Sequence, residues 1–243
     1  TRSGKGETIV LATIDLIARG DKDQSIVVAD MKGELSTKTI DLLKRHNYDV
    51  KIVNFDNLNY SMPIQLLSQA IYYAKRGNYA RARVKISQLS NTIFPSDDND
   101  FKNRFWTNGS SATFSGLVLA TMWFMQQEDD WDKVTVGNVT EMLERLETTE
   151  ETVDLDGKRI VGQPTPAMKT KQLSKLDLMI DALKERMSND QKAGKPIDQL
   201  LSMAISAFNQ AGMGGKETKR NIYSSMFSDV ELFTSDISVR KLT

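Results

Sequence analysis

The chain opens with the stretch TRSGKGETIV, residues 1–10, and this stretch decides the fold class that the sequence predicts. The pair Gly4–Lys5 matches the end of the phosphate-binding pattern G-x-x-x-x-G-K-[ST], whose first glycine would precede Thr1. In such a loop, backbone N–H groups surround the phosphates at a helix N-terminus, and the lysine reaches the β- and γ-phosphates. Gly6 stands where the pattern supplies a hydroxyl to Mg²⁺. The alternative is therefore a glycine-rich helix start with one exposed lysine.

The residues that follow the loop predict a βαβ arrangement. Apolar residues between Gly4 and Arg19 indicate a largely buried helix. The run SIVVAD (25–30) is typical of a buried parallel strand, and the segment 48–55 (YDVKIVNF) of a second one, with a helix starting at the N-cap Ser36 between them. Asp30 then lies at the carboxyl edge of the sheet, where α/β folds bind ligands. The alternative role for Asp30 is a cap at the strand end.

Most of the remaining chain has helical spacing. Helices are predicted at 63–76, 79–94, 105–127, 136–147, 172–187, 196–210 and 216–227, with Gly77 as a cap. A turn at Asp156–Gly157 predicts a small hairpin. The sequence thus predicts an α/β P-loop (RecA-like) fragment with a large inserted all-α domain. We expect residues 1–58 to begin the nucleotide-binding domain, residues 59–228 to form the insert and residues 229–243 to return toward the α/β domain.

Composition excludes several classes of protein. Lys plus Arg equals Asp plus Glu, so the net charge does not attract nucleic acid, and the absence of cysteine excludes disulfides and thiolate metal sites. His46 is the only histidine and is expected at a helix C-terminus. The uncharged segment 106–127 has an apolar part too short for a bilayer, which indicates a core helix. Asp97, Asp98 and Asp100 resemble the start of a calcium loop but lack its glycine and its final glutamate.

Five stretches together resemble one family. They are TRSGKGETIV, SIVVADMKGEL, HNYDVKIVNFDNLNYSMPIQLL, FWTNGSSATFSGLVLATMWF and ETKRNIYSSMFSDVELFTSDISVRKLT. Their order and spacing are similar to those of the TraG-like type IV coupling proteins of conjugation, in the Gram-positive branch. In that family a glycine after the loop lysine is familiar, and Met31 replaces the proline of its D-P-K-G-E motif.

The resemblance implies a membrane-anchored, hexameric ATPase at the cytoplasmic face, which uses ATP and Mg²⁺. It implies transfer of single-stranded DNA with its relaxase, recruited from the relaxosome, to secretion-channel proteins. The anchor helices are expected before Thr1 and the Walker B acids after Thr243. The isolated chain is therefore expected to be monomeric and inactive.

The resemblance also assigns nucleotide contacts. These are Arg2, Ser3, Gly4, Lys5, Gly6, Glu7, Thr8, Asp30 and Lys32. Thr8 is the nearest hydroxyl for Mg²⁺, and Glu34 is expected close to the nucleotide or to a neighbouring subunit. No catalytic residue or resident metal ligand is assigned to this chain.

Two groups of cations in the helical part are candidate contacts for DNA or a relaxosome protein. The groups are Lys75, Arg76, Arg81, Arg83 and Lys85, and Lys216, Lys219 and Arg220. Phe105 and Trp106 could stack on bases. The alternatives are solvated helix faces for the cations and core packing for the aromatic pair.

Two other functions stay open at this stage. One is a P-loop DNA translocase outside secretion. The other is a non-enzymatic all-α adaptor that docks relaxosome proteins, for which Gly6 in place of a hydroxyl residue is the best support.

Overall fold

The computed structural model divides the chain into two compact units, residues 1–62 and residues 63–243. It describes residues 6–20, 24–54, 56–95, 101–147, 150–154, 156, 160, 169–212, 216–231, 233 and 239. The assignment of residues 1–58, 59–228 and 229–243 to the parts of a nucleotide-binding domain and an insert stays a prediction.

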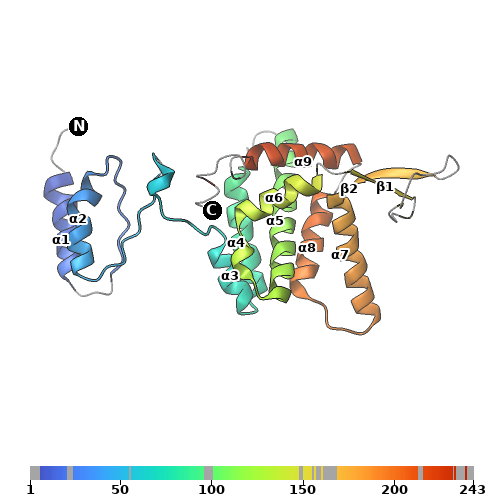
Figure 1. Cartoon of the computed structure of the whole chain (residues 1–243), viewed down its shortest axis with the longest axis horizontal. Coiled ribbons are helices and arrows are strands. Elements are labelled where there is room, and N and C mark those ends of the chain that lie inside the picture. Colours follow the sequence, from blue (N-terminus) through green and yellow to red (C-terminus); the bar gives the residue numbers. More distant parts are fainter. Residues whose placement is uncertain are drawn as a thin grey trace. The chain divides into compact units, whose positions relative to one another are not determined.

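The first unit is built on two helices. A π-helical turn, η1 (Gly6–Val10), continues into α1 (Leu11–Arg19), and α2 (Glu34–Arg45) and the 3₁₀ turn η2 (Leu58–Tyr60) follow. Figure 1 shows α1 and α2 side by side, in blue. Their buried contacts come from Ile14, Ala18 and Leu43, with Val10, Ile26, Leu42, Tyr48 and Val50 packed around them. This is a small core.

The two predicted strands do not pair in the structure. Residues 24–30 and 48–54 have no regular secondary structure, and neither has a strand partner among the residues that the structure describes. A parallel strand needs neighbours and a cover on both faces. Here Ile26 and Val50 pack toward the helices, whereas Val27 is fully exposed and Val28 partly so. The prediction of two parallel strands is therefore wrong for the described residues, which form no parallel sheet.

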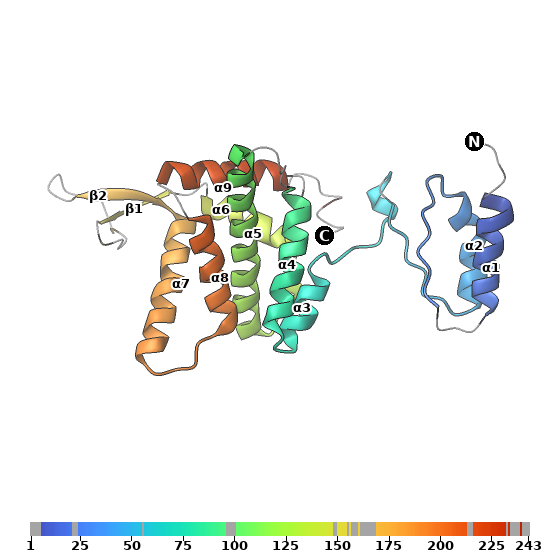
Figure 2. The same ribbon diagram turned by 180° about the vertical axis from the view of Figure 1, so that it is seen from behind.

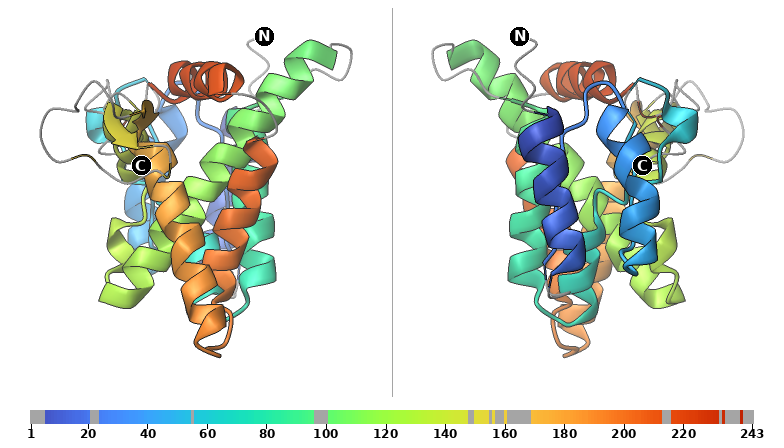
Figure 3. Two further views of the ribbon diagram at one scale, coloured as in Figure 1. Left: turned by 90° about the vertical axis from the view of Figure 1, so that its right-hand side faces the viewer. Right: turned by 90° about the vertical axis from the view of Figure 1, so that its left-hand side faces the viewer.

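The second unit is a helical bundle around one long central helix (Figures 1 and 2). Its helices are α3 (Ser68–Lys75), α4 (Tyr79–Ile93), α5 (Phe101–Glu128), α6 (Val136–Glu147), α7 (Lys175–Lys192), α8 (Gln199–Ala211) and α9 (Lys216–Val230), with the 3₁₀ turn η3 (Trp131–Lys133). α9 lies across one end of the bundle (Figures 1 and 3). The predicted helices are confirmed, apart from shifts at their ends.

α5 is buried on nearly every side, which explains its low charge. The consecutive residues Leu117, Val118, Leu119 and Ala120 are completely buried. Gly116 allows the ring of Phe208 on α8 to approach, because an added Cβ would lie 2.8 Å from that ring. In the described part of the chain no helix is long and apolar enough to cross a membrane. The prediction of a core helix is confirmed.

Two helix starts differ from the prediction for local reasons. α3 begins at Ser68 instead of Pro63, because the Gln65 side chain accepts a hydrogen bond from the N–H of Leu67 and donates to the carbonyl of Val134. α2 begins at Glu34, with Gly33 as the N-cap in the left-handed region at φ 72°. The predicted N-cap at Ser36 is therefore wrong.

A short antiparallel hairpin projects from the second unit. β1 (Glu150–Asp154) pairs with β2 (Thr170–Ser174), from Glu150 opposite Ser174 to Asp154 opposite Thr170. The prediction of a turn at Asp156–Gly157 is partly supported, because the N–H of Ile160 donates to the carbonyl of Thr152. The strand that pairs with β1, however, is Thr170–Ser174, which begins ten residues after Ile160. Gly157 lies outside the described residues.

Candidate nucleotide-binding end and nucleic-acid interface

The predicted phosphate loop is only partly described. Arg2, Ser3, Gly4 and Lys5, and the side chain of Glu7, lie outside the described residues. From Gly6 the chain is helical, and Thr8 lies exposed in the π-helical turn that leads into α1. The assignment of ATP and Mg²⁺ to this loop stays a prediction.

The N-termini of α1 and α2 point toward the same end of the first unit. The hydroxyl of Tyr48 donates to the carbonyl of Ile17 in the last turns of α1 at 3.1 Å, and its N–H donates to the carbonyl of Leu43 near the end of α2 at 3.0 Å. Both helix C-termini thus meet at Tyr48. Two parallel helices place the positive ends of their dipoles together, which favours an anion at that end.

Asp30 lies at this end, where it organises the start of α2. Its Oδ2 accepts a hydrogen bond from the N–H of Ser36 at 2.8 Å. That bond, aided by the Ser36 hydroxyl and the N–H groups of Leu35 and Lys32, holds the pKa of Asp30 below its ordinary value, against the opposing effect of burial. Asp30 therefore accepts a hydrogen bond from the first turn of α2, which differs from the strand-end cap given as its alternative role. Lys32 is exposed and has no acidic partner in the described part of the chain.

Among the residues that the structure describes, unpaired positive charge is concentrated where α3 turns into α4. Lys75, Arg76, Arg81, Arg83 and Lys85, which we call the basic turn, sit in a segment, residues 57–96, that contains no Asp or Glu. None of the five forms a salt bridge with a described residue, and all but the half-buried Lys85 are exposed. Most of the other cations of the second unit whose side chains the structure describes pair with an acid. Examples are Lys133 with Asp130, Arg145 with Glu141, Lys184 with Asp181, and both Arg186 and Lys195 with Asp190.

Aromatic rings hold the charges of the basic turn in place of carboxylates. The guanidinium carbon of Arg76 lies 3.7 Å from the ring centroid of Tyr72, which is half exposed. Arg81 lies over Tyr73 at 5.6 Å, and the Lys75 ammonium lies over Trp131 at 5.8 Å. Cation–π contacts position a cation without neutralising it. The basic turn therefore keeps its charge available to an external anion.

Helix geometry adds to this positive potential. Asn78 caps α4 by accepting a hydrogen bond from the N–H of Arg81 at 3.2 Å, and Gly77 makes the turn at φ 71°. Arg81 and Arg83 thus lie in the first turns of α4, where the helix dipole is already positive. An anionic ligand would relieve this unfavourable arrangement.

Two members of the second predicted group of cations lie near acids instead. Lys219 lies 3.8 Å from Asp177, and Arg220 lies 4.0 Å from Glu150. The side chain of Lys216 lies outside the described residues. Phe105 and Trp106 form a T-shaped pair with ring centroids 5.2 Å apart. Trp106 packs on the main core, as the packing alternative predicted, whereas Phe105 is 40% exposed.

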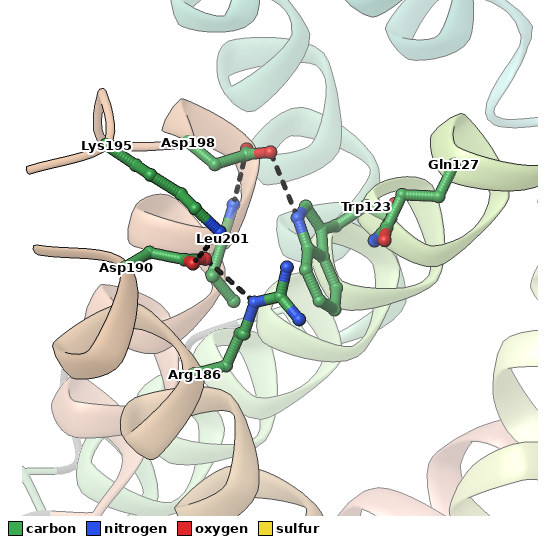
Figure 4. Close-up of polar contacts among 7 residues, drawn as sticks. All are labelled: Trp123, Gln127, Arg186, Asp190, Lys195, Asp198 and Leu201. Atoms are coloured by element: carbon green, nitrogen blue, oxygen red, sulfur yellow. Dashed lines mark hydrogen bonds and ion pairs between the residues drawn. The ribbon is translucent and has the colours of Figure 1, made fainter. Parts of the chain in front are cut away.

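A further polar cluster, which the sequence did not reveal, joins α5, α7 and α8 (Figure 4). Asp198 caps α8 by accepting bonds from the N–H groups of Leu200 and Leu201, and it also accepts a 3.0 Å bond from the indole of Trp123. Nearby, hydrogen bonds from Arg186 and Lys195 lower the pKa of Asp190. These groups satisfy one another, so the cluster is structural. An Asp before an apolar run was the available signal for the cap, but its pairing with Trp123 spans 75 residues of sequence.

The described residues contain no group of three or more acidic or histidine side chains suited to hold a metal ion. The second unit is thus an all-α module that carries an exposed, ring-supported cationic surface. The family model for type IV secretory system conjugative DNA transfer matches residues 1–243. The chain belongs to this family and is involved in conjugative DNA transfer by type IV secretion. No curated protein and no solved structure gave a significant match.

Proposed function

We propose that this chain is part of a conjugative coupling-protein ATPase that recruits a relaxase–DNA substrate and drives single-stranded DNA into the secretion channel. The family match over residues 1–243 carries this proposal. The basic turn supports it, because transferred DNA is a polyanion and a protein that binds it needs cations not already paired with acids. Action as a hexamer at the cytoplasmic face of the membrane is part of the same proposal.

The basic turn suits single-stranded DNA for two reasons. Its cations can contact successive phosphates, and the exposed ring of Tyr72 with the stacked Arg76 guanidinium offers a flat surface for an unpaired base. Each phosphate contact to a single strand contributes about 0.7 to the slope of log affinity against log salt concentration. A stacked base contributes roughly 1–3 kcal/mol.

The DNA contact is tested by fluorescence anisotropy with a labelled oligo(dT) strand at several salt concentrations. We expect the fourfold variant Lys75→Ala, Arg76→Ala, Arg81→Ala, Arg83→Ala to bind more weakly, with a salt slope smaller by about 3. The matched control replaces four cations that already pair with acids, Lys133, Arg145, Lys184 and Arg186, by alanine. Equal affinity and salt slope in the two folded variants would remove the basic turn from the DNA contact.

The proposed nucleotide site uses the loop at the start of the chain. Lys5 would neutralise the β- and γ-phosphates, and Gly4 and Gly6 would donate backbone N–H groups. The parallel arrangement of α1 and α2 supports an anion at this end. ATP would supply the free energy for transfer, and we expect the isolated chain to bind it weakly and not to hydrolyse it. ATP turnover by the isolated chain that disappears in Lys5→Ala would contradict that expectation.

A second candidate function is a non-enzymatic adaptor that docks relaxosome proteins. Gly6, in place of a hydroxyl residue that would bind Mg²⁺, favours it. The two candidates differ in one measurable respect. An adaptor captures a purified relaxase without DNA or nucleotide, and the fourfold alanine variant of the basic turn leaves that capture unchanged.

A further inference from the structure

One corner of the second unit collects acidic groups from three elements. Glu147 ends α6, Glu150 and Glu151 lie on β1, and Asp177 and Asp181 lie in the first turns of α7. The cations that face this corner are Lys175 of α7 and Lys219 and Arg220 of α9. Tyr223 of α9 is buried against it. The corner therefore joins α6, the hairpin, α7 and α9.

Glu147 is the least satisfied carboxyl group of this corner. Its Oε2 is buried and has no hydrogen-bond partner among the described residues. Glu147 also ends its helix, where the negative end of the helix dipole disfavours a carboxylate. The nearby Ser174 hydroxyl is occupied by Asp177, because it accepts from the Asp177 N–H and donates to Oδ2, both at 3.1 Å.

The cations of the corner are directed to other acids. Lys219 lies 3.8 Å from Asp177, Lys175 lies 3.8 Å from Glu151, and Arg220 lies 4.0 Å from Glu150. The Arg220 side chain is 72% exposed, so water screens its attraction to Glu147. An ionised Glu147 would thus face Asp177 and Glu150 without a close cation.

We propose that Glu147 is a proton-controlled latch, which fastens α9 and the β1–β2 hairpin to the bundle when it is protonated and loosens them when it ionises. The geometry that carries this proposal is the unpaired, buried oxygen at a helix C-terminus between two acids. Because α9 packs on both α5 and α6, a change at this corner alters how firmly the end of the bundle is closed.

The direction of the pH effect follows from the shift of Glu147. Burial, then the charge of Asp177, raises its pKa to about 7, while Arg220 and Ser174 act in the opposite direction. A group whose pKa is raised in the folded state binds its proton more tightly there. Its favourable contribution to the free energy of unfolding is therefore lost as the pH rises toward 7. The latch is fastened in mild acid and released above neutral pH.

Hydrogen exchange measured by mass spectrometry tests this proposal on the full chain. Protection factors of peptides from α9 (Lys216–Val230) are compared at pH 6 and pH 8, after correction for intrinsic exchange. With a folded pKa of about 7, we expect roughly tenfold lower protection at pH 8 in the unmodified chain. In Glu147→Gln, which keeps the shape and cannot ionise, the protection should stay nearly constant.

Glu128→Gln is the matched control, because Glu128 ends α5 as Glu147 ends α6 but is exposed. It should behave like the unmodified chain. An equal fall in protection in the unmodified chain and in Glu147→Gln, or no fall in either, would overturn the proposal. The proposal does not depend on DNA binding, so its failure leaves the proposed function untouched.

Discussion

Asp198 shows how a single carboxylate can join two distant helices. It accepts hydrogen bonds from two N–H groups at the start of α8 and from the indole of Trp123 on α5. We expect Asp198→Ala to lower the free energy of unfolding by about 1–3 kcal/mol, because both the cap and a buried indole N–H lose their partner.

Denaturant unfolding followed by circular dichroism measures this change. The control is Asp181→Ala, since the Asp181 side chain is 65% exposed and its ion pair with Lys184 is 3.8 Å long. A loss for Asp198→Ala no larger than that for the control would show that the contact with Trp123 contributes nothing.

Asp30 gives a pH dependence of the opposite sign to that of Glu147. The pKa of Asp30 is lowered in the folded state. Its contribution to the free energy of unfolding is therefore present above the ordinary Asp pKa of about 4 and is lost as the pH falls through the folded pKa. We expect protection of α2 against hydrogen exchange to fall between pH 5 and pH 3. The fall in protection should be smaller in Asp30→Asn than in the unmodified chain. Asp49→Asn changes a side chain that is 78% exposed, and it should show the same fall as the unmodified chain. Identical profiles for all three chains would refute the capping role of Asp30.

At the scale of elements, Gly77 sets the backbone geometry between α3 and α4, which positions the cations of the basic turn. Its φ of 71° lies in the left-handed region, and Gly194 between α7 and α8 has nearly the same φ, 70°. We expect Gly77→Ala and Gly194→Ala each to cost about 1–2 kcal/mol of stability. Only Gly77→Ala should weaken binding to oligo(dT) in the anisotropy measurement. If both variants or neither weakened it, the α3–α4 turn would not position the DNA contact.

The sequence predicted the helices well, because their signals are local. α4 and α6 have apolar spacing and clear ends, and the segment 106–127 of α5 is uncharged because most of it is buried. The partner of β1 was mispredicted because pairing depends on contacts far along the chain. The segment 24–30 has the composition of a strand, but a strand also needs a neighbouring strand to pair with, and composition does not determine that.

Across the whole molecule, the two units differ in the size of their cores. The second unit buries residues from all its helices around α5, whereas the first relies on Ile14, Ala18 and Leu43. A small core buries little apolar surface and gives limited stability by itself. The predicted nucleotide contacts belong to this smaller unit.

The candidate sites were foreseen to different degrees. The basic turn was visible in the sequence as five cations, but the sequence does not say which cations find acidic partners. Lys75 and Arg76 proved to be unpaired, whereas Lys219 and Arg220 proved to face Asp177 and Glu150. The latch at Glu147 could not be predicted, because its neighbours come from separate helices and a hairpin.

The most direct test of the central claim is the frequency of conjugative transfer supported by the intact protein that carries this chain. We predict that alanine at Lys75, Arg76, Arg81 and Arg83 lowers transfer roughly tenfold or more at normal protein levels, because the DNA loses its phosphate contacts. The control variant at the acid-paired residues Lys133, Arg145, Lys184 and Arg186 should transfer DNA nearly normally. Undiminished transfer by the basic-turn variant would contradict the claim that this surface engages the transferred DNA.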